Sequence, residues 1–149
     1  MVSDIRTLAH EYIADADLVG LDVLTPPLDG TILPGITRDS TLALCSAHPS
    51  RMTLPGLDAS IRLHPTERTM TVPELAAWAD EGRLLEVFTV GTAVIVAAVS
   101  RIGYNGKDIV LPAYEGSLGP VARGLYDRLS EIQEGRFEWE NWSVPCDTQ

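Results

Sequence analysis

Basic residues are scarce in this sequence, and lysine is almost absent. Eleven lysines and arginines stand against 21 aspartates and glutamates, which gives a formal net charge of −10 at pH 7, and Lys107 is the only lysine. A surface of this charge repels phosphate backbones and anionic lipids, so the composition argues against nucleic-acid and membrane partners. The two cysteines, Cys45 and Cys146, are too few for a disulfide scaffold.

Long hydrophobic runs are also missing. The longest, residues 90–99, is about half of what a membrane-spanning helix needs, and no basic N-terminal region precedes an apolar stretch, so we predict no secretory signal. Histidine and cysteine do not occur at the spacing of metal ligands, which predicts no metal site. We therefore expect a cytoplasmic protein, and 149 residues, 45% of them hydrophobic, are typical of one globular domain.

Hydrophobic periodicity and turn residues predict a fold of alternating helices and strands. A capping box that begins at Thr71 starts one helix, and the pair Asn105-Gly106 marks a hairpin. This order of elements indicates an α/β (α+β) fold. We predict helices for residues 3–14, 36–47, 71–82 and 120–134, and strands for residues 18–24, 60–63, 85–90, 93–102 and 108–111.

Two short segments have the composition of anion-binding sites. Each places a glycine, which lets the backbone approach a ligand, next to free amide groups and a threonine hydroxyl. The first lies where a predicted helix begins, and helix N-termini favour phosphate. The second lies between two predicted strands. A glycine before a helix is more often only a turn, so neither segment is specific by itself. The residues are Gly35, Ile36 and Thr37 in the first segment, and Gly91, Thr92 and Ala93 in the second.

Five longer motifs occur in a fixed order along the chain. They are TPPLDGTILPGITRD (25–39), EGRLLEVFTVGTA (81–93), VSRIGYNGKDI (99–109), LGPVAR (118–123) and DRLSEIQEGR (127–136). With these motifs, residues 18–149 closely resemble the branched-chain amino acid aminotransferases, which are class IV aminotransferases and fold-type IV pyridoxal phosphate (PLP) enzymes, like the D-amino-acid aminotransferases. The resemblance implies a truncated large, cofactor-binding domain. Residues 1–17 form a divergent N-terminal segment.

The resemblance implies a role for both anion-binding segments. In the family, groups equivalent to Ile36 and Thr37 bind the PLP phosphate, and groups equivalent to Thr92 and Ala93 bind the phosphate and the substrate carboxylate. The family's Schiff-base lysine lies upstream of the Thr-Pro-Pro segment, in a region with no counterpart here, and Lys107 falls where the family has a surface turn. We therefore expect residual binding of PLP or phosphate but no covalently held cofactor.

These features predict a truncated aminotransferase relative that has been repurposed. The first hypothesis is a PLP-independent enzyme that acts on a small metabolite by acid–base isomerisation, cyclisation or elimination in the former cofactor cavity, for example in secondary metabolism. Each candidate catalytic residue is also consistent with a solvated helix face. The candidates lie in the divergent N-terminal segment and are His10, Glu11, Tyr12, Asp15 and Asp17.

Two alternatives remain open. The chain is either half of a branched-chain aminotransferase, which needs a partner chain to supply the lysine, or a non-catalytic subunit. The resemblance also implies a homodimer, because family members are dimers and the absence of their small domain would expose apolar surface. His48 and His64 lie in loop-like segments and are expected on the surface.

Overall fold

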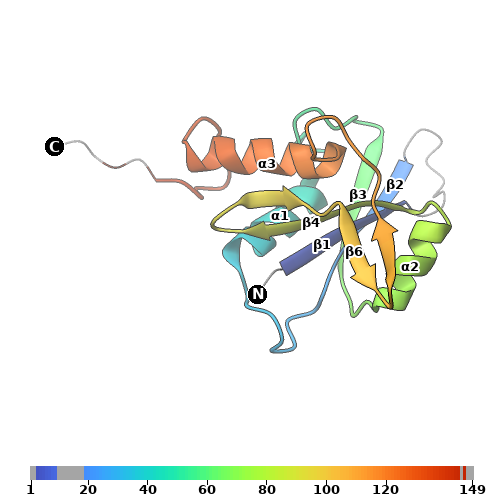
Figure 1. The fold of residues 1–149 in the computed structure, drawn as a ribbon. Helices are drawn as coiled ribbons and strands as arrows, with labels where there is room; N and C mark the ends of the chain where they lie inside the picture. Colours follow the sequence, from blue (N-terminus) through green and yellow to red (C-terminus); the bar gives the residue numbers. More distant parts are fainter. Residues whose placement is uncertain (1–2, 10–18, 145, 147–149) are drawn as a thin grey trace.

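The computed structural model describes residues 3–9, 19–144 and 146, and contains a five-stranded sheet (Figure 1). The strand order is β3-β2-β1-β4-β5. β1 is antiparallel to both of its neighbours, β2 and β3 are parallel, and β4 and β5 form an antiparallel hairpin. β2 and β4 therefore run in the same direction, and their carboxyl ends define one edge of the sheet, called here the carboxyl edge. The bounds are β1 Ser3–Ala9, β2 Val19–Thr25, β3 Ile61–Glu67, β4 Leu84–Gly91 and β5 Ile95–Ala98.

Three helices and a two-stranded sheet cover the two faces of the large sheet. Val23 and Phe88 face one hydrophobic core, whereas their neighbours Leu24 and Val87 face another, because successive side chains of a strand alternate between faces. The first core contains residues of α1 and α3, and the second contains residues of α2 and β7. The result is an α/β fold of three layers. The bounds are α1 Ile36–Ala47, α2 Val72–Asp80, α3 Pro120–Gln133, β6 Arg101–Tyr104 and β7 Lys107–Val110.

Most of the predicted elements are confirmed. The helices expected after residue 35, at the capping box and near residue 120 are α1, α2 and α3. The apolar stripe of α3 is buried, because it packs against the sheet. At the predicted hairpin, Asn105 and Gly106 have φ angles of 48° and 74°, which suit a tight turn between β6 and β7.

The helix predicted for residues 3–14 is wrong where the structure describes this segment, because Ser3–Ala9 is strand β1. Residues 10–14 lie outside the described residues. The backbone of Arg6 pairs with Leu24 on one side and with Val87 on the other. A short apolar pattern suits a helix face and a strand almost equally well. Two neighbouring strands satisfy the backbone groups of β1, and no local pattern reveals such partners.

Two predicted strands have different bounds in the structure. The strand expected for residues 93–102 is divided into β5, which belongs to the large sheet, and β6, which pairs with β7 in the small sheet. The strand expected for residues 60–63 is longer and runs through Pro65 as β3. Proline is tolerated there because β3 is an edge strand, where one side of the backbone needs no partner strand.

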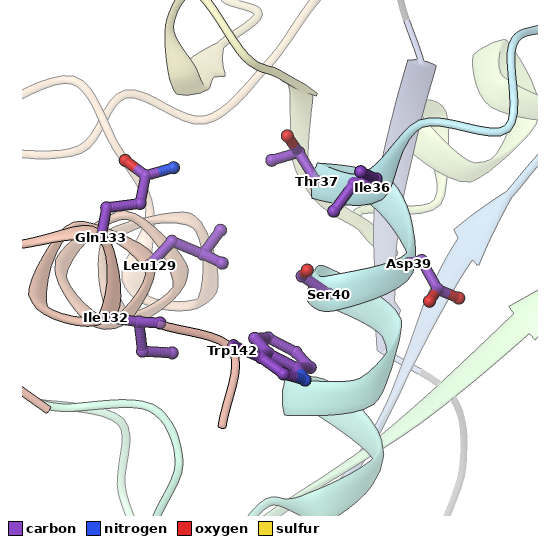
Figure 2. A pocket seen from close by; sticks show the side chains of 8 residues that line it. All are labelled: Ile36, Thr37, Asp39, Ser40, Leu129, Ile132, Gln133 and Trp142. Carbon is purple, nitrogen blue, oxygen red and sulfur yellow. The ribbon is translucent and has the colours of Figure 1, made fainter. Parts of the chain in front are cut away.

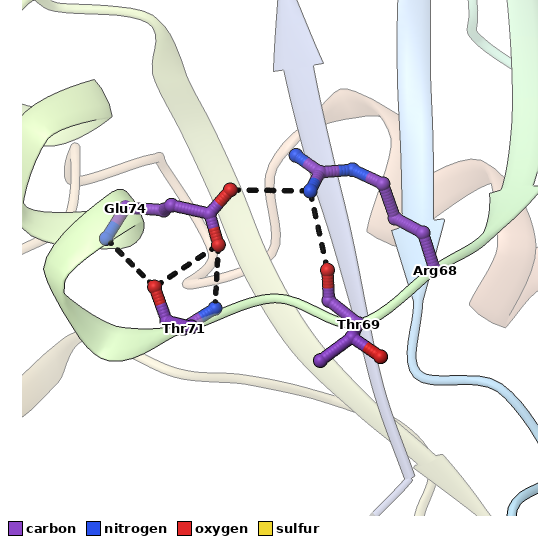
Figure 3. A network of polar contacts seen from close by, with 4 residues as sticks. All are labelled: Arg68, Thr69, Thr71 and Glu74. Atoms are coloured by element: carbon purple, nitrogen blue, oxygen red, sulfur yellow. Dashed lines mark hydrogen bonds and ion pairs between the residues drawn. The ribbon is translucent and has the colours of Figure 1, made fainter.

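The start of α2 has the predicted capping box (Figure 3). The Thr71 hydroxyl accepts a hydrogen bond from the Glu74 amide at 3.4 Å, and the Glu74 carboxylate accepts one from the Thr71 amide at 2.7 Å. Arg68 donates to the same carboxylate at 3.2 Å and to the Thr69 carbonyl at 3.2 Å. The Thr71 amide and then the Arg68 guanidinium hold the pKa of Glu74 below its usual value.

Replacing Thr71 by alanine is expected to lower the free energy of unfolding by about 1 kcal/mol, because the first turn of α2 loses its side-chain cap. Urea denaturation of the variant and the wild-type protein measures this. Glu74 contributes to the free energy of unfolding because its pKa is lower in the folded state than its usual value of 4.5. This contribution is present above pH 4.5 and is lost as the pH falls through the lower, folded-state pKa. Thr69→Ala is the matched control, because Arg68 bonds to the backbone carbonyl of Thr69, which alanine keeps. Equal losses of stability in both variants would contradict the role of Thr71 as the cap of α2.

Candidate functional site

The two predicted anion-binding segments lie at the same edge of the sheet. The backbone of Arg6 pairs with both Leu24 and Val87, so these two residues lie at the same position along the direction of the strands. From Val87, β4 continues to Gly91 at the carboxyl edge. From the end of β2, residues 26–35 lead to the start of α1, which packs against β3 and β4. Figure 1 shows the turn between β4 and β5 at the same end of the sheet as the start of α1.

The first turn of α1 presents unpaired amides at this edge. Its N-cap is Gly35, and no described side chain caps the helix. The first amides of a helix have no partner within it, and the helix dipole favours an anion there. The Ile36 side chain is 85% exposed, and Thr37 is half-buried. Asp39 also lies in this first turn and is exposed, so it offsets part of the positive potential.

Both glycines of the predicted segments leave room for a ligand. A Cβ atom placed on Gly91 meets no described atom within 4 Å, and one placed on Gly35 meets only the Arg38 Cβ at 4.0 Å. Thr92 is exposed in the turn that follows Gly91. Side-chain packing among the described residues therefore does not explain either glycine, and both positions leave space for a ligand to approach the backbone, although the Gly35 amide itself donates to the Leu33 carbonyl at 2.8 Å.

Arg38 fixes the loop that leads into α1, and sequence reasoning missed it. This side chain is only 3% exposed. It donates to the Thr25 hydroxyl at 3.3 Å and to the Pro26 carbonyl at 2.8 Å, and its guanidinium lies 3.0 Å from the Glu67 carboxylate. Arg38 thereby joins the ends of β2 and β3 to the first turn of α1. The sequence alone offers little indication of this role. It shows only an arginine in the first turn of a predicted helix, close after a turn-rich segment.

A pocket of about 340 Å³ adjoins the start of α1 (Figure 2). α1 and α3 form its two walls, and the segment after α3 adds an indole ring. Figure 2 shows the apolar side chains of α3 facing α1 across the opening. The lining is mixed, with apolar groups and several hydroxyl, amide and carboxylate groups, as in many small-molecule sites. The lining residues are Ile36, Thr37, Asp39, Ser40, Leu129, Ile132, Gln133 and Trp142.

Arginines and aromatic rings hold in place the segment after α3 that carries Trp142. The Arg128 guanidinium lies 3.5 Å from the centre of the Phe137 ring, and that of Arg51 lies 3.7 Å from the Trp139 ring. Phe137 and Trp139 are stacked with centroids 6.3 Å apart, and Trp142 meets Trp139 edge to face at 6.2 Å. Cation–π contacts and aromatic pairs of this kind stabilise a segment that has no regular secondary structure.

Glu86 is a buried carboxylate that sequence reasoning also missed. It is 6% exposed on β4 and accepts hydrogen bonds from the amides of Val121 and Ala122 at 3.0 and 3.1 Å. These amides belong to the first turn of α3, whose N-cap Gly119 has no side chain. Burial raises the pKa of Glu86, and the two amides act in the opposite direction. Glu86 therefore caps α3 from a neighbouring strand.

Of the residues that the sequence analysis considered, the lysine and His48 lie away from this edge, and the catalytic candidates are not among the described residues. Lys107 is exposed and belongs to β7, which lies in the layer on the far side of the sheet from α1. His48, expected on the surface, is instead 2% exposed, and its Nε2 atom lies 3.5 Å from the Asp58 carbonyl. The predicted catalytic set lies outside the described residues and comprises His10, Glu11, Tyr12, Asp15 and Asp17.

The chain is similar to aminotransferases of several organisms. A mitochondrial branched-chain-amino-acid aminotransferase of Schizosaccharomyces pombe is 39% identical over 84% of this chain and 27% of its own length. A cytosolic one of Saccharomyces cerevisiae is 38% identical over 82% of the chain and 30% of its own length. One of Dictyostelium discoideum is 39% identical over 97% of the chain and 38% of its own length.

The chain is a partial homologue of the branched-chain-amino-acid aminotransferases. The agreement in identity across three organisms decides this, and the resemblance found in the sequence is confirmed. The chain spans only 27–38% of the length of these aminotransferases. No family model matches it. Among the described helices, none has the length and apolar character to cross a membrane.

Proposed function

We propose that this chain binds a small molecule through its phosphate group at the carboxyl edge, and that PLP is such a ligand. The observation that carries the proposal is the joint position of the α1 N-terminus and the Gly91-Thr92 turn at one edge of the sheet. Amides of Ile36 and Thr37 and the hydroxyls of Thr37 and Thr92 would hold the phosphate. The relatives named as aminotransferases support PLP in particular.

The described residues fit only one end of PLP. The open positions at Gly35 and Gly91 suit the phosphate. In aminotransferases PLP supplies an aldehyde that reacts with amines, but the only lysine of these 149 residues, Lys107, lies on the opposite face of the sheet. We therefore expect these residues alone to bind PLP without transaminating.

Calorimetric titration tests the proposal with PLP, pyridoxal and inorganic phosphate as probes. PLP should bind at least 10-fold more tightly than pyridoxal, because a hydrogen bond to a charged group contributes about 1.5–3 kcal/mol. Thr37→Val and Thr92→Val keep the side-chain shape but remove a hydroxyl, and each should weaken PLP binding by about 10-fold or more. Measured affinities give the result directly.

Two controls accompany this titration. Thr69→Val removes an exposed hydroxyl from the segment before α2, and Lys107→Arg removes the one lysine amine; both should leave PLP affinity unchanged. Equal affinities for PLP and pyridoxal would contradict phosphate binding. Exchange of an amino group between an amino acid and a keto acid by the isolated polypeptide with PLP would contradict the second half of the proposal.

A second candidate function is the PLP-independent acid–base enzyme. The position of Lys107 on β7, on the opposite face of the sheet from α1, favours it, because isomerisation, cyclisation or elimination needs no amine, only a positioned acid and base. It stays a proposal, with His10, Glu11, Tyr12, Asp15 and Asp17 as its proposed acids and bases. The cytoplasmic location and the homodimer also stay predictions.

A further inference from the structure

The pocket between α1 and α3 has the size of a site for a small ring compound. Its volume is about 340 Å³. A protein cavity of about 150 Å³ holds one benzene ring, so this pocket has room for two fused rings. Leu129 and Ile132 form its apolar side on α3, opposite α1 (Figure 2). Apolar walls with a few polar groups are typical of small-molecule sites.

Trp142 gives the pocket an aromatic surface that the described residues leave partly uncovered. Its side chain is 39% exposed. The indole ring meets Trp139 edge to face, and no described ring is stacked parallel on it. Trp139 is in turn buried and lies against the Arg51 guanidinium, so the Trp142 ring is supported in its position before a ligand arrives. A flat aromatic ring suits this surface, because aromatic pairs gain more than their buried area alone.

Polar but uncharged groups line both helical walls. Ser40 of α1 and Gln133 of α3 line the pocket, and neither side chain makes a hydrogen bond to another described residue. A hydroxyl and an amide each donate and accept hydrogen bonds. The described lining contains no basic side chain, and its one carboxylate, Asp39, lies on the side of α1 turned away from α3 (Figure 2). A charged ligand would therefore lose hydration without gaining a counter-ion.

We infer that the α1–α3 pocket binds a neutral, flat compound of two fused rings that carries hydrogen-bond donors and acceptors. Its ring packs against Trp142, and its polar groups bond to Ser40 and Gln133. This site goes beyond the proposed function, because it requires neither a phosphate group nor PLP. The two sites adjoin at Thr37, which lines this pocket and belongs to the proposed phosphate site.

Titration with indole-3-acetamide tests the inference, because this probe is neutral, has two fused rings and carries an amide. The chain has three tryptophans, so an amide NMR spectrum of the isotope-labelled protein contains three indole N–H signals. The probe should shift the signal of Trp142, which is identified by its absence in Trp142→Leu. The signal of Trp78 should stay unchanged, because Trp78 packs in the core on the opposite face of the sheet.

Substitutions in two different walls should weaken the binding. Trp142→Leu keeps an apolar side chain but loses the aromatic pair, and Ser40→Ala loses one hydrogen bond, so each should lower the affinity by about 2- to 10-fold. Ser50→Ala is the matched control, because it removes an exposed hydroxyl outside the pocket. Phenylacetamide, with one flat ring, should bind more weakly than indole-3-acetamide, and cyclohexylacetamide, whose ring is not flat, more weakly still.

Other outcomes overturn the inference. Equal shifts of the Trp78 and Trp142 signals would show unspecific contact, and equal affinities for phenylacetamide and cyclohexylacetamide would show that no aromatic ring packs on Trp142. If the anionic indole-3-acetate binds as tightly as the amide, the ligand is not selected for neutrality. Failure of indole-3-acetamide to bind also contradicts the inference, but it leaves the proposed function standing, because the probe carries no phosphate.

Discussion

Replacing Gly119 by alanine is expected to lower the free energy of unfolding by about 3–5 kcal/mol. The new Cβ atom would lie 2.5 Å from Glu86 Cγ and closer still to its carboxylate. Glu86 is buried, and a shift of its carboxylate away from the new Cβ would break its hydrogen bonds to the α3 amides that it caps. Overpacking costs about 1–3 kcal/mol, and the loss of bonds to a charged group costs about 1.5–3 kcal/mol more. Thermal unfolding should shift downward by roughly 10 °C.

A double-mutant cycle separates this clash from any intrinsic effect of alanine. Gly119 has φ of −69° and ψ of 171°, which alanine adopts without strain. In a Glu86→Ala background, where the carboxylate is absent, Gly119→Ala should therefore cost less than about 1 kcal/mol. Gly103→Ala is the matched control, because its Cβ would lie at an ordinary 3.7 Å from Asp108. Additive losses from the two substitutions would show that the Glu86 contact is not the cause.

Replacing Arg38 by methionine is expected to destabilise the protein by about 2–4 kcal/mol. Methionine keeps the apolar stem, but the buried Thr25 hydroxyl and the Pro26 carbonyl lose their donor, and an unsatisfied buried polar group costs about 1–3 kcal/mol. Because Arg38 fixes the entry into α1, the proposed PLP affinity should also fall by about 10-fold. Urea denaturation and calorimetric titration measure the two effects.

Two comparisons make the Arg38 result specific. Glu67→Gln should cost less than about 1 kcal/mol, because the Glu67 side chain is 44% exposed and its ion pair is screened by water. Arg62→Met replaces an exposed arginine of β3 and should have little effect on either stability or affinity. An Arg38→Met variant as stable as Arg62→Met would contradict the role of Arg38 as a clamp.

The sequence predicted local elements well and long-range partners poorly. The capping box at Thr71, the hairpin at Asn105-Gly106 and the apolar stripe of α3 are encoded by adjacent residues, and all three are present. Residues 3–9 were predicted as a helix because their spacing was judged without the strands on either side. The long strand expected for residues 93–102 was divided because its two halves pair with different partners.

The candidate site shows the same division between local and distant information. Residues 35–37 and 91–93 were identified as candidate sites from the sequence itself. They lie at the same edge of the sheet because β1 pairs with both β2 and β4, which therefore run in the same direction. Arg38 and Glu86 were missed, because their partners lie 12 to 36 residues away along the chain. Charged residues are rarely buried unless they have a partner, so nothing in the sequence around Arg38 or Glu86 indicates burial. Their burial becomes evident only when the fold brings these partners next to them.

By itself the sequence determined the α/β class, the relationship to aminotransferases and the presence of a single lysine, since composition, motif order and local periodicity are properties of the chain alone. Only the tertiary structure decided that Lys107 lies across the sheet from α1 and that the two glycine segments share an edge. Strand pairing and burial decide such placements, because both depend on backbone hydrogen bonds and apolar contacts between residues far apart in the sequence.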